Sequence, residues 1–342
     1  MGGLFRGRCG IRAAGSFREV LNGVALVDHH AHGILRAPPR TLDEFRGLFS
    51  ESLDPRQWPH VATGVTYQRA IRVLADHLGC EPTERAVYER RLAADPGEYA
   101  SLMLRGTGLE MLLVDDGFPP ADVSVDWREL GALAGCASRP VLRIERVAQD
   151  AVRAEVATAR ERGYAALKTI AAYRGGLDRV DEVVVAALEA NEATGDPLPV
   201  QVHAGFGDSD LWLPRADPGH LKPLVERFRE TSFVLLHCYP FVREAGWLAH
   251  VYGNVFFDLS LTIPHVARPA TALAEALELA PVSKLLYASD AARTPELYLL
   301  AATWWRDALA AVLPEMLPGD AVEDAARMIL RDNARALYRL PD

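Results

Sequence analysis

Two histidines separated by one residue follow a short apolar run near the start of the chain. The run is VALVD (Val24–Asp28), and His30 and His32 come directly after it. Residues i and i+2 of an extended chain point to the same side, so these two imidazoles could bind one metal ion. Asp28 belongs to the same alternating set and could orient a ligand histidine through a hydrogen bond. For this motif alone, a polar loop that contains histidines would be the simpler explanation.

Three further ligand-type residues stand at the ends of later apolar runs. His203 ends PVQVH, His237 ends FVLLH, and Asp290 closely follows KLLY. In a (β/α)8 barrel the C-terminal ends of all strands share one mouth, so these side chains would converge there. Histidine and carboxylate ligands suit zinc, manganese or iron(II). We therefore predict a divalent metal centre, with zinc as the first choice and one or two ions, formed by His30, His32, His203, His237 and Asp290.

Eight short, largely apolar runs alternate with stretches of helical pattern. The runs are Val24–Asp28, Leu109–Val114, Pro140–Ile144, Tyr164–Ile170, Pro199–His203, Phe233–His237, Val255–Leu259 and Lys284–Tyr287. Near-continuous apolar strands are typical of parallel sheets that are covered on both faces. Strands that alternate with helices in this number favour an α/β fold of the closed (β/α)8 TIM-barrel type. An open doubly wound sheet is the alternative.

One long interval interrupts this alternation. Residues 41–105 lie between the first two strands, are mostly helical in pattern, and are too many for a simple connection. We expect a helical insertion that stands over the C-terminal mouth of the barrel. The predicted organisation is a single metal-dependent barrel domain over residues 21–342, preceded by a poorly ordered N-terminal extension over residues 1–20.

The composition is that of an ordinary folded chain of 342 residues, with 49% hydrophobic and 24% charged residues. A net charge of −9 argues against a nucleic-acid partner, which would need a basic face, and against anionic membrane surfaces. The four cysteines form no CxxC pair, which favours a reducing compartment. No apolar run approaches the roughly 20 residues that span a bilayer. We expect a cytoplasmic protein with a small-molecule substrate and no nucleic-acid or membrane partner; a homo-oligomer is left open.

With these residues placed, the chain resembles the amidohydrolase superfamily, whose pattern is HxH on strand one, histidines on strands five and six, and aspartate on strand eight. The resemblance runs from Leu26 to Leu340. It is closest to the amidohydrolase-like N-terminal domain of fungal and plant proteins that are fused to a glutamine synthetase-like domain. The stretches that carry it are LVDHHAH (26–32), VLRIE (141–145), LKTIAAYRGGL (167–177), VHAGFGDSD (202–210), LLHCYPFVREAGWLA (235–249), FFDLSLTIP (256–264) and YASDAARTPELY (287–298). No synthetase-like domain follows, so we expect a stand-alone enzyme.

The resemblance also assigns a role to Lys168, which ends the fourth strand. In binuclear members of the superfamily a lysine at this place is carboxylated by CO2 and bridges two metal ions, whereas mononuclear members differ there. Lys168 could be such a bridge, or a cation that holds a substrate carboxylate. A purely structural lysine at a crowded strand end would need a partner.

A metal-assisted hydrolysis follows from this ligand set. The metal would lower the pKa of a bound water toward neutrality and stabilise the tetrahedral oxyanion. Asp290 could accept the proton of the water and pass it to the leaving group. His237, if it is not a ligand, could polarise the scissile carbonyl.

Polar and aromatic residues that follow the strands are the candidates for substrate binding. They are Tyr173, Arg174, Asp208, Asp210, Tyr239, Arg243 and Arg293. An arginine at the mouth could hold a carboxylate bidentately, and either aspartate could hold an ammonium group. Together they favour an amide of a small, amino-acid-like acid, such as a γ-glutamyl amide. Surface salt bridges would explain most of these charges equally well.

Other functions stay open at this point. A metal-dependent non-oxidative decarboxylase occurs on a sister branch of the superfamily, and a uronate-type isomerase is a more distant option. An ester, lactone or phosphoester hydrolase would use the same hydroxide. A barrel that has lost catalysis and serves as a binding module is the remaining alternative, although every expected ligand position is filled. Two metal ions and a carboxylated Lys168 would favour hydrolysis.

Overall fold

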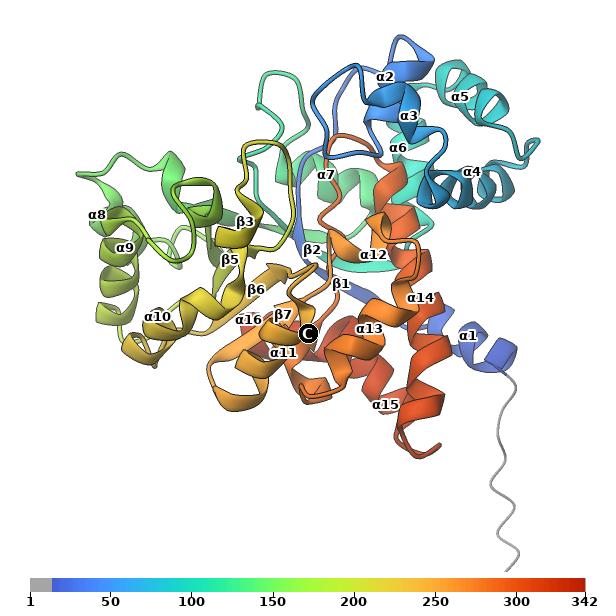
Figure 1. Cartoon of the computed structure of the whole chain (residues 1–342). Helices are drawn as coiled ribbons and strands as arrows, with labels where there is room; N and C mark the ends of the chain where they lie inside the picture. Colours follow the sequence, from blue (N-terminus) through green and yellow to red (C-terminus); the bar gives the residue numbers. More distant parts are fainter. Residues whose placement is uncertain (1–13, 342) are drawn as a thin grey trace, which may run out of the picture.

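Eight parallel strands follow one another around the molecule in sequence order, and each pairs with the next (Figure 1). They are β1 (Leu26–Ala31), β2 (Leu109–Val114), β3 (Ala137–Arg143), β4 (Ala166–Thr169), β5 (Val200–Ala204), β6 (Phe233–His237), β7 (Val255–Asp258) and β8 (Leu285–Leu286). Beyond β8, the backbone N–H of Asp290 donates to the carbonyl of His30 at 3.0 Å, and that of His32 donates to the carbonyl of Ala291 at 2.9 Å. The computed structural model, which describes residues 14–341, thus confirms the predicted (β/α)8 barrel in a nearly closed form.

Strand β1 does not have its predicted bounds. It begins at Leu26 rather than Val24 and continues to Ala31, so it includes His30. Its pairing with β2 changes register between Asp28 and Ala31, which marks an irregularity of the bulge type. Because a bulge breaks the strict alternation of side chains, the face predicted for Asp28 does not hold.

Helices fill the interval between β1 and β2. They are α2 (Leu42–Gly47), α3 (Trp58–Val61), α4 (Val65–Leu78), α5 (Glu84–Ala93) and α6 (Pro96–Arg105). Thr41 and Thr83 cap α2 and α5 by accepting backbone N–H bonds, as expected for these residues at helix starts. The Arg46 guanidinium of α2 pairs with Glu84 of α5 at 2.6 Å, which ties the first helix of the insertion to the fourth. The insertion lies as one group beside the barrel mouth (Figure 1).

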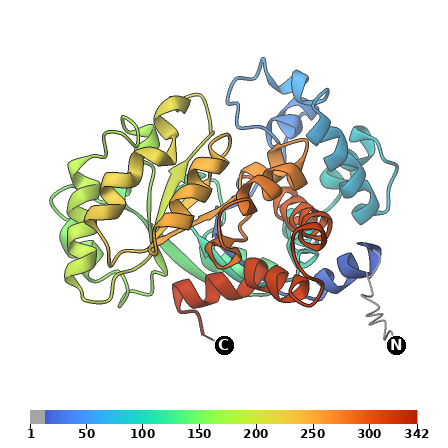
Figure 2. The ribbon, with the colours of Figure 1, turned by 60° about the horizontal axis from the view of Figure 1, so that its bottom comes forward.

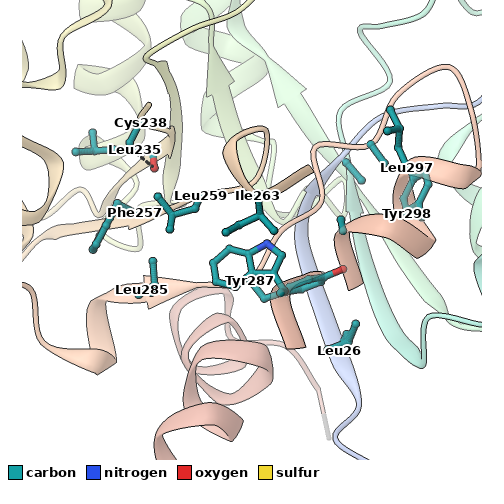
Figure 3. Packing of buried hydrophobic residues seen from close by; sticks show 14 of the residues in the cluster. Leu26, Leu235, Cys238, Phe257, Leu259, Ile263, Leu285, Tyr287, Leu297 and Tyr298 are labelled. Carbon is teal, nitrogen blue, oxygen red and sulfur yellow. Dashed lines mark hydrogen bonds between the residues drawn. The ribbon is translucent and has the colours of Figure 1, made fainter. Parts of the chain in front are cut away.

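The remaining helices for the most part cover the outside of the sheet. They are α7 (Trp127–Ala134), α8 (Val152–Ala157), α9 (Glu182–Ala193), α10 (Lys222–Arg227), α11 (Val242–Val251), α12 (Thr262–His265), α13 (Pro269–Leu277) and α14 (Glu296–Met316), followed by α15 (Val322–Arg327) and α16 (Asn333–Tyr338). The long helix α14 is largely buried, with Trp304 and Trp305 at most 1% exposed. Figure 3 shows Tyr287 surrounded by Leu26, Ile263 and Leu285 in this core.

The inside of the barrel is a separate apolar cluster. Inward-facing residues of the strands, among them Val27, Leu113, Val234 and Leu236, are fully buried there. Tyr338 of α16 packs against the same cluster. The C-terminal helices lie across this end of the barrel (Figure 2), so the metal-ligand candidates stand at the opposite, open end.

The N-terminal extension expected over residues 1–20 falls mostly outside the described residues. Its remainder, from residue 14, belongs to α1 (Ala14–Asn22). Phe17 is 4% exposed, and the Arg18 guanidinium pairs with Asp307 of α14 at 2.5 Å. These contacts are the physical reason why this part is helical rather than disordered. Among residues 14–341, every helix is too short or too polar to traverse a bilayer.

Candidate metal centre

Three predicted ligands meet where β1 and the chain after β8 run side by side. His30 Nε2 lies 3.0 Å, and His32 Nε2 3.3 Å, from Asp290 Oδ1. His30 is fully buried, His32 is 7% exposed, and the Asp290 side chain is 10% exposed. Asp290 has a left-handed backbone with φ of 49°, a conformation that aspartate tolerates better than most residues. One ligand atom from each of the three lies within 4.8 Å of the others.

The histidines of β5 and β6 stand beside this group. The ring centroids of His203 and His237 are 4.5 Å apart, and those of His30 and His237 are 5.9 Å apart. His237 Nδ1 lies 3.6 Å from Asp290 Oδ2. The structure therefore brings all five predicted side chains together, while their role as ligands stays a prediction.

The donor set fits a divalent cation. His203 Nε2 and Asp290 Oδ1 are buried and have no hydrogen-bond partner among the described residues, which is costly unless another group satisfies them. Burial lowers the pKa of His30 to about 4 and that of His203 to about 3, and it holds the pKa of His237 well below its usual value. Burial alone would raise the pKa of Asp290, but the contacts with His237, His30 and His32 hold it well below its usual range. Neutral imidazoles and a carboxylate are the forms that bind metal ions.

Lys168 lies inside the barrel against the same group. It is 1% exposed, and its Nζ is 3.0 Å from His30 Nε2. Burial lowers the pKa of Lys168 to about 8, although nearby Asp115 and Asp290 oppose the shift. The neutral amine is therefore accessible at mildly alkaline pH.

Three of the four candidate histidines are held by a hydrogen bond at Nδ1. His30 Nδ1 contacts Gln201 Oε1 at 2.8 Å, His32 Nδ1 contacts the carbonyl of Asp115 at 2.9 Å, and His237 Nδ1 contacts Ser260 Oγ at 2.7 Å. The sequence analysis missed Gln201, although it stands two residues before His203 on one strand and so shares its side.

The role suggested for Asp28 is wrong. Its carboxylate accepts from the backbone N–H of Ser289 at 3.0 Å and contacts the backbone N of His30 at 3.4 Å, rather than any ligand ring. The register of β1 against β2 shifts between Asp28 and Ala31, so the strict alternation on which this prediction rested does not apply there.

A cavity of about 230 Å³ opens above the metal centre. Of the predicted substrate-binding residues it is lined by Tyr173, Arg174, Asp208 and Asp210, and it also contacts Lys168, His32, His203, His237 and Asp290. Gly207 has no side chain where the Tyr173 hydroxyl packs; a Cβ would lie 3.2 Å from His203 Nε2.

Six lining residues were not predicted as site residues: Glu51, Phe118, Arg143, Ile170, Leu261 and Ala292. Arg143 ends β3 and is in register with Lys168, so its position at a strand end was the available signal. Its Nε and Nη2 donate to Asp115 Oδ2 at 2.9 and 2.5 Å. This guanidinium holds the pKa of the buried Asp115 carboxyl well below its usual range, against the effect of burial. Glu51 comes from the insertion, where no strand periodicity could place it.

The other predicted substrate-binding residues lie elsewhere. The Arg243 side chain is 77% exposed and pairs with Glu275 of α13 at 3.1 Å, away from the cavity. Tyr239 is 44% exposed, with its ring 6.0 Å from that of Phe206. Arg293 donates to the carbonyl of Ser50 at 2.6 Å and lies 3.5 Å from Glu51, so it borders the cavity only through the insertion.

A comparison with protein families shows to which of them this chain belongs. The model of the amidohydrolase family matches residues 127–340, more than half of the chain. The chain belongs to the amidohydrolase family. This confirms the resemblance drawn from the motifs, and it makes the protein an enzyme of a metal-dependent hydrolase superfamily. Such a hydrolase requires a divalent metal ion, for which the His30, His32 and Asp290 group is the candidate site.

Known proteins resemble this amidohydrolase in sequence and in fold. Protein fluG of Emericella nidulans is 40% identical over 161 residues, which are 45% of this chain and 19% of that protein, so the match covers a small part of the relative. A proposed metal-dependent hydrolase from Lactobacillus casei ATCC 334 has a TM-score of 0.82 at 26% identity, covering 94% of this chain and 97% of that one. Uronate isomerase from Thermotoga maritima has a TM-score of 0.62 at 12% identity, covering 95% and 97%, a likeness of fold alone.

Proposed function

We propose that this amidohydrolase cleaves the amide C–N bond of a small, amino-acid-like substrate, such as a γ-glutamyl amide, with the help of zinc. The observation that carries the proposal is the convergence of His30 Nε2 and His32 Nε2 on Asp290 Oδ1 beside a cavity of small-molecule size. His203 and His237 complete the proposed ligand set. Manganese or iron(II) would fit the same donors.

The reaction uses the charges that the fold holds in place. A bound metal ion would supply a water of lowered pKa and a positive charge for the scissile carbonyl. Asp290, a carboxylate at neutral pH, takes the proton of the attacking water and returns it to the leaving nitrogen. His237 donates its Nδ1 proton to Ser260 Oγ, because Ser260 Oγ gives its own proton to Asp258 Oδ1 at 2.7 Å. The neutral ring then has no proton on Nε2, which supports a ligand role for His237 over a role in polarising the carbonyl by hydrogen bonding.

The lining of the cavity carries charges of both signs. Arg174 is exposed there, and no described residue pairs with its guanidinium, so it is available for a substrate carboxylate. Asp208 and Asp210 are available for an ammonium group, although Asp208 Oδ1 already accepts the backbone N–H of Asp210 at 3.0 Å. Opposite charges in one small cavity support a substrate with both an acid and an amino group.

Lys168 has two roles that the proposed function can use. As a neutral amine it would react with CO2 to form a carbamate that bridges two metal ions; as an ammonium it would hold a substrate carboxylate. The 3.0 Å distance between Lys168 Nζ and His30 Nε2 is compatible with either role. Metal content measured with and without added bicarbonate separates them, because only the carbamate requires CO2.

We also propose that residues 21–342 act as one enzyme domain in the cytoplasm. The continuous barrel formed by β1 to β8 supports the single domain. The absence of a CxxC pair supports a reducing compartment.

The test is a substrate screen on metal-depleted protein that is reloaded with zinc, manganese or iron(II). We expect release of ammonia or amine from γ-glutamyl and related amides, with one or two ions bound per chain. Release of CO2 from carboxylic acids, with no amide cleaved, would replace hydrolysis by decarboxylation. Full activity after removal of all metal would contradict the proposal.

A further inference from the structure

Beneath the metal centre, the barrel contains buried polar side chains that the proposed reaction does not use. His29 comes from β1, Gln201 from β5, Asp258 from β7 and Tyr338 from α16, and each is at most 1% exposed. The neighbouring interior is apolar. Polar groups in such surroundings are costly unless they are hydrogen-bonded, so their partners indicate what they do.

Gln201 determines which nitrogen of His30 carries the proton. Its Nε2 donates to the carbonyl oxygen of His29 at 2.6 Å, and a carbonyl can only accept. Its Oε1 therefore faces His30 Nδ1, 2.8 Å away, and accepts the proton of that nitrogen. His30 is left with an unprotonated Nε2, the atom that approaches Asp290.

Tyr338 extends these bonds to His29. Gln201 Nε2 lies 3.2 Å from Tyr338 Oη and acts as the donor. The hydroxyl proton of Tyr338 is then directed to His29 Nδ1, 3.0 Å away, so His29 carries its own proton on Nε2. That atom lies 2.9 Å from Asp258 Oδ2. The contact is electrostatic rather than an aligned hydrogen bond, and neither atom has a hydrogen-bond partner among the described residues.

Asp258 connects His29 to a second candidate ligand. Its Oδ1 accepts from the backbone N–H of His237 at 2.7 Å and from Ser260 Oγ at 2.7 Å. Ser260 Oγ donates its only proton to Asp258, so the same oxygen accepts from His237 Nδ1 at 2.7 Å. The Nε2 atoms of His30 and His237 are thus kept free of protons by one connected set of side chains.

We propose that Tyr338, on the C-terminal helix α16, is a positioning residue for the metal centre. Its hydroxyl links the Gln201–His30 half of this set to the half formed by His29, Asp258 and His237. Without it, His29 Nδ1 loses its proton donor, and the imidazole is no longer restricted to the tautomer that faces Asp258 with an N–H. This inference rests on the metal-binding part of the proposed function. Loss of a hydrogen bond made directly to a ligand typically weakens metal binding by about 10- to 100-fold, and Tyr338 acts one bond further away, through Gln201 and His29.

The test compares two tyrosine variants of the full chain. Tyr338→Phe removes the linking hydroxyl, and Tyr67→Phe is the matched control, because it removes a tyrosine hydroxyl that bonds Glu84 at 2.7 Å within the insertion. Zinc affinity is measured by competition with a chromophoric chelator, and imidazole tautomers by ¹⁵N NMR of the metal-free protein. We expect zinc binding weaker by up to about tenfold, the lower end of the effect of a direct ligand partner, and a second His29 tautomer in Tyr338→Phe alone.

Wild-type zinc affinity together with an unchanged imidazole pattern in Tyr338→Phe would overturn the proposal. So would a wild-type spectrum in which the proton of His29 resides on Nδ1, a measurement that does not depend on the variant folding. If the wild type bound no metal, the proposed function would fail. The imidazole pattern of the metal-free protein would still test the role of Tyr338, because that measurement needs no bound metal.

Discussion

The metal centre and the rim of the cavity were predicted from the same sequence with different outcomes. At the centre, His30, His203, His237 and Asp290 stand within bonding reach of one another or in ring contact. At the rim, Arg174 lines the cavity whereas Arg243 lies on the outer surface, paired with a neighbouring helix. The C-terminal ends of the strands in a closed barrel all lie at one mouth, whereas residues in loops and first helical turns can face the cavity or the outer surface. The position of a side chain at a strand end is therefore predicted far more reliably from sequence than that of a side chain in the loop that follows.

The largest effect should come from the centre. Asp290→Asn removes the proton acceptor and one candidate ligand, and we expect activity to fall by at least about 10³-fold, within the range of general acid–base contributions. Activity and bound metal of the purified variant provide the measurement. Asp307→Asn, at an exposed ion pair with Arg18, is the control and should keep both. Substantial activity in Asp290→Asn would contradict a catalytic role for Asp290, and with it the contrast between the metal centre and the rim.

Lys168 predicts a pH dependence of stability. Its pKa is lowered to about 8 in the folded protein, so between pH 8 and 10.5 the unfolded chain binds more protons than the folded one. Stability conferred by this site must then rise with pH across that window, by up to about 3 kcal/mol. The free energy of unfolding of the metal-free protein, measured without CO2 at pH 8 and pH 10, should show this rise relative to Lys168→Met. Parallel pH profiles of the two proteins would mean that folding does not lower the pKa of Lys168.

The first test of the rim concerns Arg174, which lines the cavity. Arg174→Ala removes the guanidinium that is available for a substrate carboxylate, and KM should rise by about 10- to 100-fold, equivalent to about 1.4–2.7 kcal/mol. Steady-state kinetics with the substrate found in the screen and with its descarboxy analogue give the measurement. The analogue should be insensitive to the change; an equal loss for both would assign Arg174 a structural role.

Arg243 gives the smallest expected effect. Its pair with Glu275 is exposed, so Arg243→Ala should change the free energy of unfolding by less than about 1 kcal/mol and leave KM unaltered. Kinetics under the conditions used for Arg174→Ala, together with urea unfolding, are sufficient. A tenfold rise in KM would place the substrate across the outer rim and cancel the distinction between the two arginines.

Sequence reasoning found most of the barrel because its signals are local. Apolar runs set the strands, and β2 and β6 have the predicted bounds. The ligand-type residues at strand ends required only the barrel topology in addition. The face of Asp28 could not be found in this way, because the register change in β1 depends on pairing with β2.

What the sequence by itself determined is the order of strands and helices and the residue types at each strand end, since periodicity and composition record which positions are buried. Only the tertiary structure decided that Tyr338, in the last helix, bonds His29 and Gln201 beneath the metal centre, and that Glu51 of the insertion reaches the cavity. The physical reason is that both contacts join segments far apart in the chain through side-chain geometry. No local pattern encodes a hydrogen bond of that kind, because its partners are set by how the barrel closes.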